Sequence, residues 1–474
     1  MTHGDLIALS PFITLAATSI MIMLSIAFYR NHALTVILTL AGLAASAASI
    51  FNATSILPRQ VTMLLTIDQY ACYYILILIV ASMAVAALSF GYLEIQVGHK
   101  EEFYLLLLLA TLGCAVLASA SHFASFFLGI ELLSVSLYAL AAYLRHSDRG
   151  VEAGVKYLIL AAVSSAFILF GMALIYAVVG SMEFSVIAAR VATAPAHRSL
   201  LSAGLVLIIV GMGFKLAVVP FHLWTPDVYE GAPAPVTAFI ATASKGAVFS
   251  LVLRFFTRID IHGQESVFMI FTVIAIASMF FGNLLALFQT NVKRILAYSS
   301  ISHLGYLLVT LLASGSLAAT AATFYLTAYF ITTLGAFGVI MLLSGKDRDA
   351  DSMDDYQGLA WQRPWLAGVF IAMLFSLAGI PLTAGFIGKF YVVLVGVGSS
   401  LWLLVAILAI NSAIGLVYYL RIIAALFASA KEPATVPTLS FMGNAVLAIL
   451  TILLLWLGTY PGPVIDMIKK AVLF

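Results

Sequence analysis

Residues 211–227, GMGFKLAVVPFHLWTPD, combine two features that ordinary membrane helices avoid. Lys215 interrupts an apolar run, and Pro220 follows it closely. An ionisable side chain at membrane depth costs roughly 2.5–3.5 kcal/mol on insertion scales, and proline removes a hydrogen bond from a helix. A membrane helix that accepts both is expected to divide into two half-helices beside a functional charge.

The composition around this stretch is that of a membrane protein. The chain has 474 residues, of which 63% are hydrophobic and 9% are charged, whereas about a quarter of the residues in soluble proteins are charged. Its apolar runs are close to the length of a spanning helix and lack the alternation of barrel strands. We therefore predict an all-α, polytopic, multi-pass protein that forms a single membrane domain, 1–474, in a lipid bilayer.

About fourteen apolar windows are long enough to cross a bilayer. We expect the first to be an uncleaved span, because an acidic residue and no lysine or arginine precede it. Only the linker 345–362 is both long and rich in charge. The windows fall at 9–29, 33–52, 70–93, 103–120, 123–144, 156–179, 201–222, 235–256, 267–289, 296–313, 319–343, 365–394, 400–427 and 438–458.

A second span carries the same combination of proline and lysine. In SLAGIPLTAGFIGKFYV, residues 376–392, Pro381 precedes Lys389. The two broken spans are the seventh and the twelfth in chain order. Because successive spans alternate in direction, these two are expected to cross the membrane in opposite directions. This arrangement is typical of inverted repeats, with the ion site beside each discontinuity. We predict N-terminal helices at 1–100, a first repeat at 101–260, a second repeat at 261–430 and a C-terminal helix at 431–474.

Three charges lie inside predicted spans of the first repeat. Glu131, in HFASFFLGIELLSVSLYAL, is about 10 Å deep at about 1.5 Å per residue, which favours a proton relay or a lysine partner over a packing role alone. Lys215 is too far from either end of its span to reach water easily, and Lys245 lies well inside the next span. Burial disfavours an ammonium while a nearby carboxylate favours it, so such a lysine can load and release a proton. A structural salt bridge is the alternative.

The other candidates have stronger structural alternatives. Lys389 has the same character, although it could be an interface lysine whose amine reaches outward. His222 and His303 could relay protons or pack through hydrogen bonds. Lys156 and Lys293 lie near the inner ends of spans, where reaching to the interface is the default and proton uptake is the alternative. We expect Arg254 and Arg258 to be interface anchors.

No pattern in the chain predicts a cofactor. Cys72 and Cys114 lie in apolar segments far apart in sequence, which is not a metal or disulfide pattern. No glycine-rich phosphate loop follows a strand, and no basic run indicates nucleic acid. We predict a charge relay with no metal, cofactor or redox centre on this chain.

Residues 211–236, 281–306 and 376–392 together resemble the antiporter-like subunits of respiratory complex I, the bacterial NADH:quinone oxidoreductase. The resemblance runs from the first span to the last. It implies a fold of about fourteen helices with two inverted five-helix repeats, each containing a broken helix, and one proton-translocating module in the bacterial inner membrane. The partners would be other complex I membrane subunits, including related antiporter-like subunits. FMN, iron–sulfur clusters and quinone would be held in partner subunits.

The resemblance also implies roles for single residues. By motif position, Glu131 is similar to the family's glutamate, Lys215 to its paired lysine, Lys245 to its central lysine and Lys389 to its terminal group. Lysine at the last position, with no long lateral helix expected after the last span, is similar to one of the antiporter-like subunits. A proton from the cytoplasm would reach Lys215 or Lys245 under the influence of Glu131, and transfer to Lys389 would precede release outside.

Two other functions are consistent with these residues. A subunit of a multi-subunit sodium/proton antiporter would share the glutamate, the lysines and the broken helices. A structural scaffold would use the buried charges only to fix helix packing.

Overall fold

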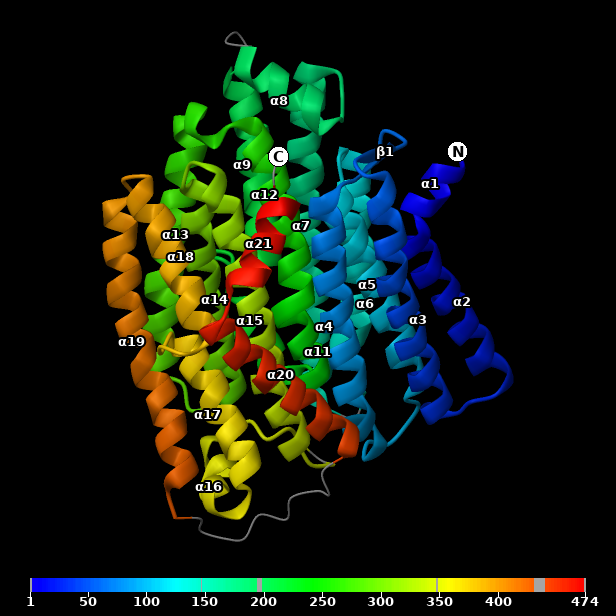
Figure 1. Ribbon diagram of the computed structural model, residues 1–474, viewed down its shortest axis with the longest axis vertical. Helices are drawn as coiled ribbons and strands as arrows, with labels where there is room; N and C mark the ends of the chain where they lie inside the picture. The colour runs from blue at the N-terminus through cyan, green and yellow to red at the C-terminus, as the bar shows by residue number, and fades with distance from the viewer. Residues whose placement is uncertain (1, 146, 194–197, 347, 430–439, 473–474) are drawn as a thin grey trace.

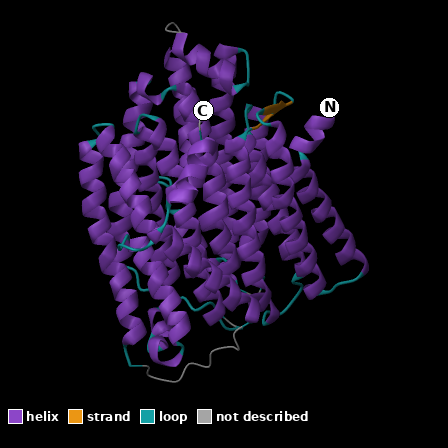
Figure 2. Cartoon of the chain, in the orientation of Figure 1, coloured by secondary structure: helices purple, strands orange, loops and turns teal. Residues whose placement is uncertain are grey.

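The computed structural model describes residues 2–145, 147–193, 198–346, 348–429 and 440–472. Most of the described chain is helical, and the long helices lie side by side along one axis (Figures 1 and 2). A short antiparallel hairpin, β1 (Arg59–Val61) and β2 (Leu65–Ile67), lies at one end of the bundle. The all-α prediction is confirmed, although the sequence did not indicate the hairpin.

The helices follow the predicted windows along the whole described chain. The first group comprises α1 (His3–Ala8), α2 (Ser10–Phe28), α3 (His32–Ala53) and α4 (Gln69–Glu94). The second comprises α5 (Glu101–Ser119), α6 (Phe123–Ala141), α7 (Asp148–Val179), α8 (Phe184–Thr193), α9 (Arg198–Leu216), α10 (Trp224–Gly231), α11 (Ala234–Phe239) and α12 (Lys245–Ile259). The third comprises α13 (Glu265–Leu287), α14 (Val292–Leu312), α15 (Ser316–Leu343), α16 (Leu359–Gln362), α17 (Pro364–Ala378), α18 (Ala384–Gly398) and α19 (Trp402–Phe427), and α20 (Phe441–Thr459) and α21 (Gly462–Ala471) end the chain.

Among the described residues, 13 helices are long and apolar enough to cross a membrane. The shorter apolar helices α17 and α18 together occupy the remaining predicted window. Polar side chains at the ends of apolar runs explain where several helices begin, because they accept hydrogen bonds from otherwise unpaired backbone N–H groups. Asp68 caps α4, Asn291 caps α14 and Thr383 caps α18 in this way.

Both predicted helix breaks are present. Residues 217–223, which include Pro220, separate α9 from α10, and residues 379–383, which include Pro381, separate α17 from α18. A break inside a membrane exposes backbone polar groups that need partners. Side chains supply them in the first break, where Trp224 Nε1 donates to the Phe214 carbonyl at 3.0 Å and Ser278 Oγ accepts from the Val219 N–H at 2.9 Å.

A third irregularity was not predicted. Residues Ile240–Ser244 form a π-helical segment between α11 and α12, directly before Lys245. Such segments widen a helix locally and are frequent at functional sites.

The C-terminal helices brace the bundle from outside. In Figure 1, α20 and α21 run obliquely across the front of the molecule, and both contact α4 and α15. The predicted boundary at 430/431 lies outside the described residues.

Arg254 contradicts its expected role as an interface anchor. Its side chain is 0% exposed and forms a bidentate ion pair with Asp68, with two N–O distances of 2.8 Å. Its guanidinium also lies 4.7 Å from the centre of the Tyr70 ring. The sequence reasoning failed here because Asp68, far away in the chain, supplies the counter-charge that makes burial possible.

We predict that Arg254→Met strongly destabilises the protein, because it leaves the Asp68 carboxylate without its buried partner. Breaking such a pair typically costs about 3–5 kcal/mol. The double variant Asp68→Asn/Arg254→Met, which removes both charges but keeps a capping side chain on α4, is expected to recover much of the loss. Thermal unfolding of the purified membrane protein measures both, and an equal loss in the double variant would contradict the explanation.

Candidate functional site

Glu131 and Lys215 lie in one cluster formed by α6, α7 and α9. Lys215 is 5% exposed, and its Nζ donates to Ser134 Oγ at 2.6 Å. Glu131 lies one turn before Ser134 on α6 and accepts a hydrogen bond from Ser165 Oγ at 2.5 Å. Residues three apart lie on the same face of a helix, so Glu131 lies on the face of α6 that Lys215 contacts through Ser134. The structure therefore brings the two residues together, with a serine as the direct contact of the lysine.

Lys245 occupies the centre of the bundle at the end of the π-helical segment. It is 1% exposed, and its Nζ donates to Ser300 Oγ on α14 at 2.7 Å. Tyr329 on α15 donates to the same oxygen at 2.8 Å, and the Tyr229 ring lies 5.3 Å from the amine. These contacts of Lys245 are hydroxyls and a ring face.

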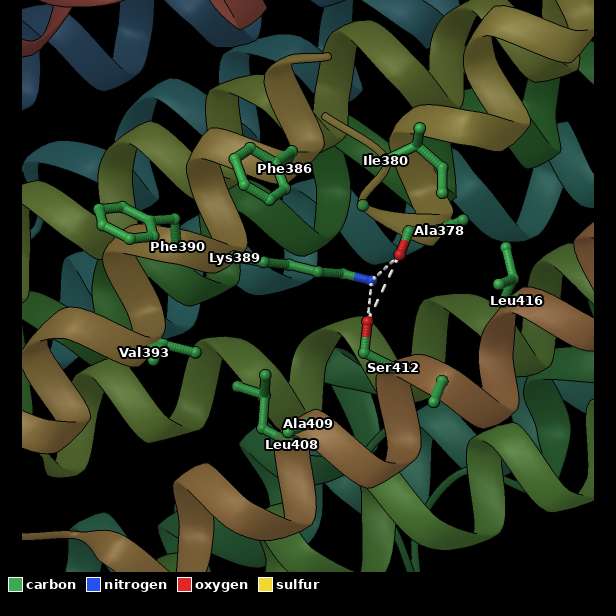
Figure 3. Close-up of a pocket in the computed structure, with 12 residues that line it drawn as sticks. Ala378, Ile380, Phe386, Lys389, Phe390, Val393, Leu408, Ala409, Ser412 and Leu416 are labelled. Atoms are coloured by element: carbon green, nitrogen blue, oxygen red, sulfur yellow. Dashed lines mark hydrogen bonds between the residues drawn. The ribbon is translucent and has the colours of Figure 1, made fainter. Parts of the chain in front are cut away.

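Lys389 projects from α18 into the second helix break (Figure 3). Its Nζ donates to the Ala378 carbonyl and to Ser412 Oγ, both at 2.8 Å, and lies 5.4 Å from the centre of the Tyr306 ring. Ala378 ends α17, where helix carbonyls lack intrahelical partners and carry partial negative charge. Lys389 lines a cavity of about 400 Å³ between α17, α18 and α19, and its amine is bonded inside the protein.

The three lysines share one kind of contact. Each ammonium donates to a serine hydroxyl at 2.6–2.8 Å, through Ser134, Ser300 and Ser412. A hydroxyl can accept a hydrogen bond from an ammonium and can also donate one to a neutral amine. A carboxylate partner would instead hold the lysine in its charged form. The contacts thus suit a lysine that changes protonation state.

His303 lies between Lys245 and Lys389. Its Nδ1 is 2.7 Å from the Tyr325 hydroxyl, and its Nε2 is 3.3 Å from the Tyr419 hydroxyl. Its ring centre is 5.4 Å from that of Tyr329, which shares Ser300 with Lys245. From the same helix, Tyr306 reaches the ring contact with Lys389. Polar side chains therefore follow one another from the central lysine to the terminal one.

The remaining candidates are placed differently. His222 is buried in the first break. Lys156 is 43% exposed and pairs with Glu152 and Asp227 at 2.7 and 2.9 Å, as expected near a span end. Lys293 corrects the expectation of an amine that reaches outward, because it is 0% exposed and pairs with Asp349 at 2.7 Å.

Among the described residues, no group of three or more His, Cys, Asp or Glu side chains is placed to hold a metal ion. Cys72 and Cys114 are buried free thiols.

Sequence reasoning missed the serine partners. Ser134 lies one turn from Glu131 and Ser300 lies beside His303, so their spacing held a weak signal. Ser412 and the π-helical segment had no signal, because serine is common in membrane helices and the segment has no distinctive composition.

One family model and a full-length relative match this chain. The model of the family described as NADH:quinone oxidoreductase/Mrp antiporter, TM matches residues 120–415. NADH-quinone oxidoreductase subunit N of Ectopseudomonas mendocina (strain ymp) is 48% identical over 485 residues, which cover 100% of this chain and 97% of the relative.

Two solved structures share the fold. A chain of respiratory complex I from Thermus thermophilus has a TM-score of 0.83 and 32% identity, covering 96% of this chain and 98% of that one. A chain of the Mrp complex from Dietzia sp. DQ12-45-1b has a TM-score of 0.86 and 20% identity, covering 100% and 97%. These matches confirm the predicted antiporter-like membrane fold, while the repeat boundaries at 101–260 and 261–430 stay a prediction.

Gly379 offers a test of the Lys389 geometry. Its φ is +85°, and an added Cβ would lie 2.8 Å from Lys389 Cδ and 3.3 Å from Nζ. We predict that Gly379→Ala displaces the lysine from the Ala378 carbonyl and costs about 1 kcal/mol or more. The control is Gly368→Ala on α17, where a Cβ meets nothing within 4 Å. Thermal unfolding should separate the two, and equal midpoints would refute the close contact.

Proposed function

Since the chain belongs to the NADH:quinone oxidoreductase/Mrp antiporter family, we propose that it is a proton-translocating membrane subunit of a bacterial NADH:quinone oxidoreductase. Its place is in the membrane arm beside the other antiporter-like subunits, as a multi-pass protein of the bacterial membrane. Electron transfer takes place in partner subunits, which hold FMN, iron–sulfur clusters and quinone. This chain supplies proton movement.

Overall identity favours this function over sodium/proton exchange. The relative that matches the whole chain at 48% identity is NADH-quinone oxidoreductase subunit N. The Mrp chain is as similar in fold as the complex I chain, but its sequence is only 20% identical, so this match supports the fold alone.

The observation that carries the proposal is the row of three buried lysines, each bonded to a hydroxyl. Between Lys245 and Lys389 lie Ser300, Tyr329, His303 and Tyr306. Hydrogen bonds join Lys245, Ser300 and Tyr329, whereas His303 meets Tyr329 and Tyr306, and Tyr306 meets Lys389, through ring contacts, so transfer there needs water or a side-chain rotation. Hydroxyl and imidazole groups can donate on one side and accept on the other. His303 is thus the titratable side chain of this stretch that lies between the contacts of the two lysines.

The step from Lys215 to Lys245 also lacks a continuous path. No direct hydrogen bond between the described side chains joins the Ser134 cluster to the Ser300 cluster. Transfer there requires water or a movement of the half-helices. This gap provides a place where a signal from the partner subunits can control the proton.

The electrostatic energy available is sufficient. Moving one charge against 100 mV requires about 2.3 kcal/mol. A carboxylate and an ammonium about 4 Å apart interact by about 4 kcal/mol at an effective dielectric of about 20, and the interaction weakens with distance. Neutralising Glu131 or moving it away from Lys215 removes energy of this order from the charged lysine, which favours release of its proton.

We predict that Lys215→Ala and Glu131→Ala each lower coupled NADH:quinone oxidation and proton pumping about tenfold in an assembled complex, because a buried relay group is lost. Lys469→Ala, at a side chain that is 49% exposed on α21, is the control and should leave both unchanged. Pumping is measured as acidification of inverted vesicles. Normal proton-to-electron ratios in both variants would support the scaffold alternative.

A second prediction separates the two transport functions. Purified complex in proteoliposomes should move protons only when NADH and quinone are supplied, with no dependence on sodium. A fluorescent pH indicator inside the vesicles reports this directly. Sodium-dependent proton exchange without NADH or quinone would establish the antiporter function instead.

A further inference from the structure

The charged linker between α15 and α16 reaches the first broken span through Lys293. Lys293 lies at the start of α14 and is 0% exposed. Its Nζ donates to the Glu230 carbonyl at 3.0 Å, to the Ala232 carbonyl at 2.7 Å and to Asp349 Oδ2 at 2.7 Å. One ammonium therefore joins the end of α10 to the linker.

The Glu230 and Ala232 carbonyls lie at the C-terminal end of α10, where backbone oxygens lack intrahelical partners. A positive charge is favourable there, because the helix dipole is negative at this end. Lys389 makes the same kind of contact with α17 through the Ala378 carbonyl. In each broken span, a buried lysine thus holds the C-terminus of a half-helix.

Asp349 is the counter-charge of Lys293 and is itself held in place. Its second oxygen accepts a hydrogen bond from Tyr92 on α4 at 2.8 Å. The linker is also tied to the start of α14, since the Val292 N–H donates to the Asp351 carbonyl and Asn291 Nδ2 donates to Asp351 Oδ2 at 2.7 Å. Asp349 and Lys293 therefore connect the linker to the end of α10.

The end of α10 in turn touches the central lysine. Tyr229, next to Glu230, places its ring 5.3 Å from Lys245 Nζ. A shift of this half-helix would change the surroundings of Lys245. The same linker continues into α16 and α17, the first half of the second broken span.

We propose that Lys293 and Asp349 are positioning residues, which couple the charged linker to α10 and thereby set the environment of Lys245. This inference rests on the proposed function. In this proposal, the linker connects the two broken spans, so that a movement of one span displaces the other. If Lys293 and Asp349 had only a structural role, their variants would affect assembly of the complex but not pumping by the assembled complex.

Asp349→Asn tests the proposal in the assembled complex, because it removes the counter-charge and keeps the side-chain size. We expect coupled NADH oxidation and pumping to fall about 3- to 10-fold. NADH oxidation by an artificial acceptor that bypasses quinone should stay unchanged. Hydrogen exchange of the α10 peptide should be faster, and Asp349→Glu should restore part of the coupled rate.

The matched control is Asp354→Asn in the same linker, whose Oδ1 accepts from Gln357 Nε2 in an exposed contact. It should leave coupled rate and α10 exchange unchanged. If Asp349→Asn prevents assembly, Tyr92→Phe decides, because it removes one hydrogen bond to Asp349 and should cause a smaller change in the same direction. Wild-type pumping and wild-type α10 exchange in the assembled variant would overturn the proposal.

Lys245→Met separates this failure from that of the proposed function. If Lys245→Met abolishes pumping while Asp349→Asn has no effect, only the positioning role is wrong. If Lys245→Met also pumps normally, the relay itself is wrong.

Discussion

An ammonium bonded to a serine hydroxyl inside a membrane bundle is the interaction on which the rest of this structure depends. Lys215, Lys245 and Lys389 each make it. A hydroxyl stabilises both protonation states of a lysine, whereas a carboxylate would fix the charged one. The cost of burial is thus kept moderate without removing the ability of the lysine to give up its proton.

The helix breaks make room for this chemistry. Splitting a span exposes carbonyls that need partners inside the bundle, and Lys389 satisfies one of them at the end of α17. Lys293 bonds carbonyls at the other end of the half-helix α10, where it meets α11. Charge and backbone irregularity therefore stabilise each other, and the same contacts connect the half-helices to the groups that carry protons.

The sequence predicted the features that stand out against an apolar background. Lys215, Lys245 and Glu131 were recognisable because each is a charge within a long apolar run, and the breaks were recognisable from proline. Arg254 and Lys293 were misjudged, since a basic residue near a span end looks the same whether it faces lipid or pairs with a distant acid such as Asp68 or Asp349. The spacing of Ser134 and Ser300 gave only a weak signal, and Ser412 could not be predicted, because serine is common in membrane helices.

The proton-to-electron ratio of a Ser300→Ala complex tests the relay most directly. Ser300 joins Lys245 to Tyr329, so the account predicts a lower ratio at an unchanged rate with an artificial electron acceptor. The reference is Ser136→Ala, which removes a buried hydroxyl that, within the described part of the chain, donates to the Leu132 carbonyl of its own helix. A wild-type ratio in Ser300→Ala would contradict passage of the proton along the lysine and hydroxyl row.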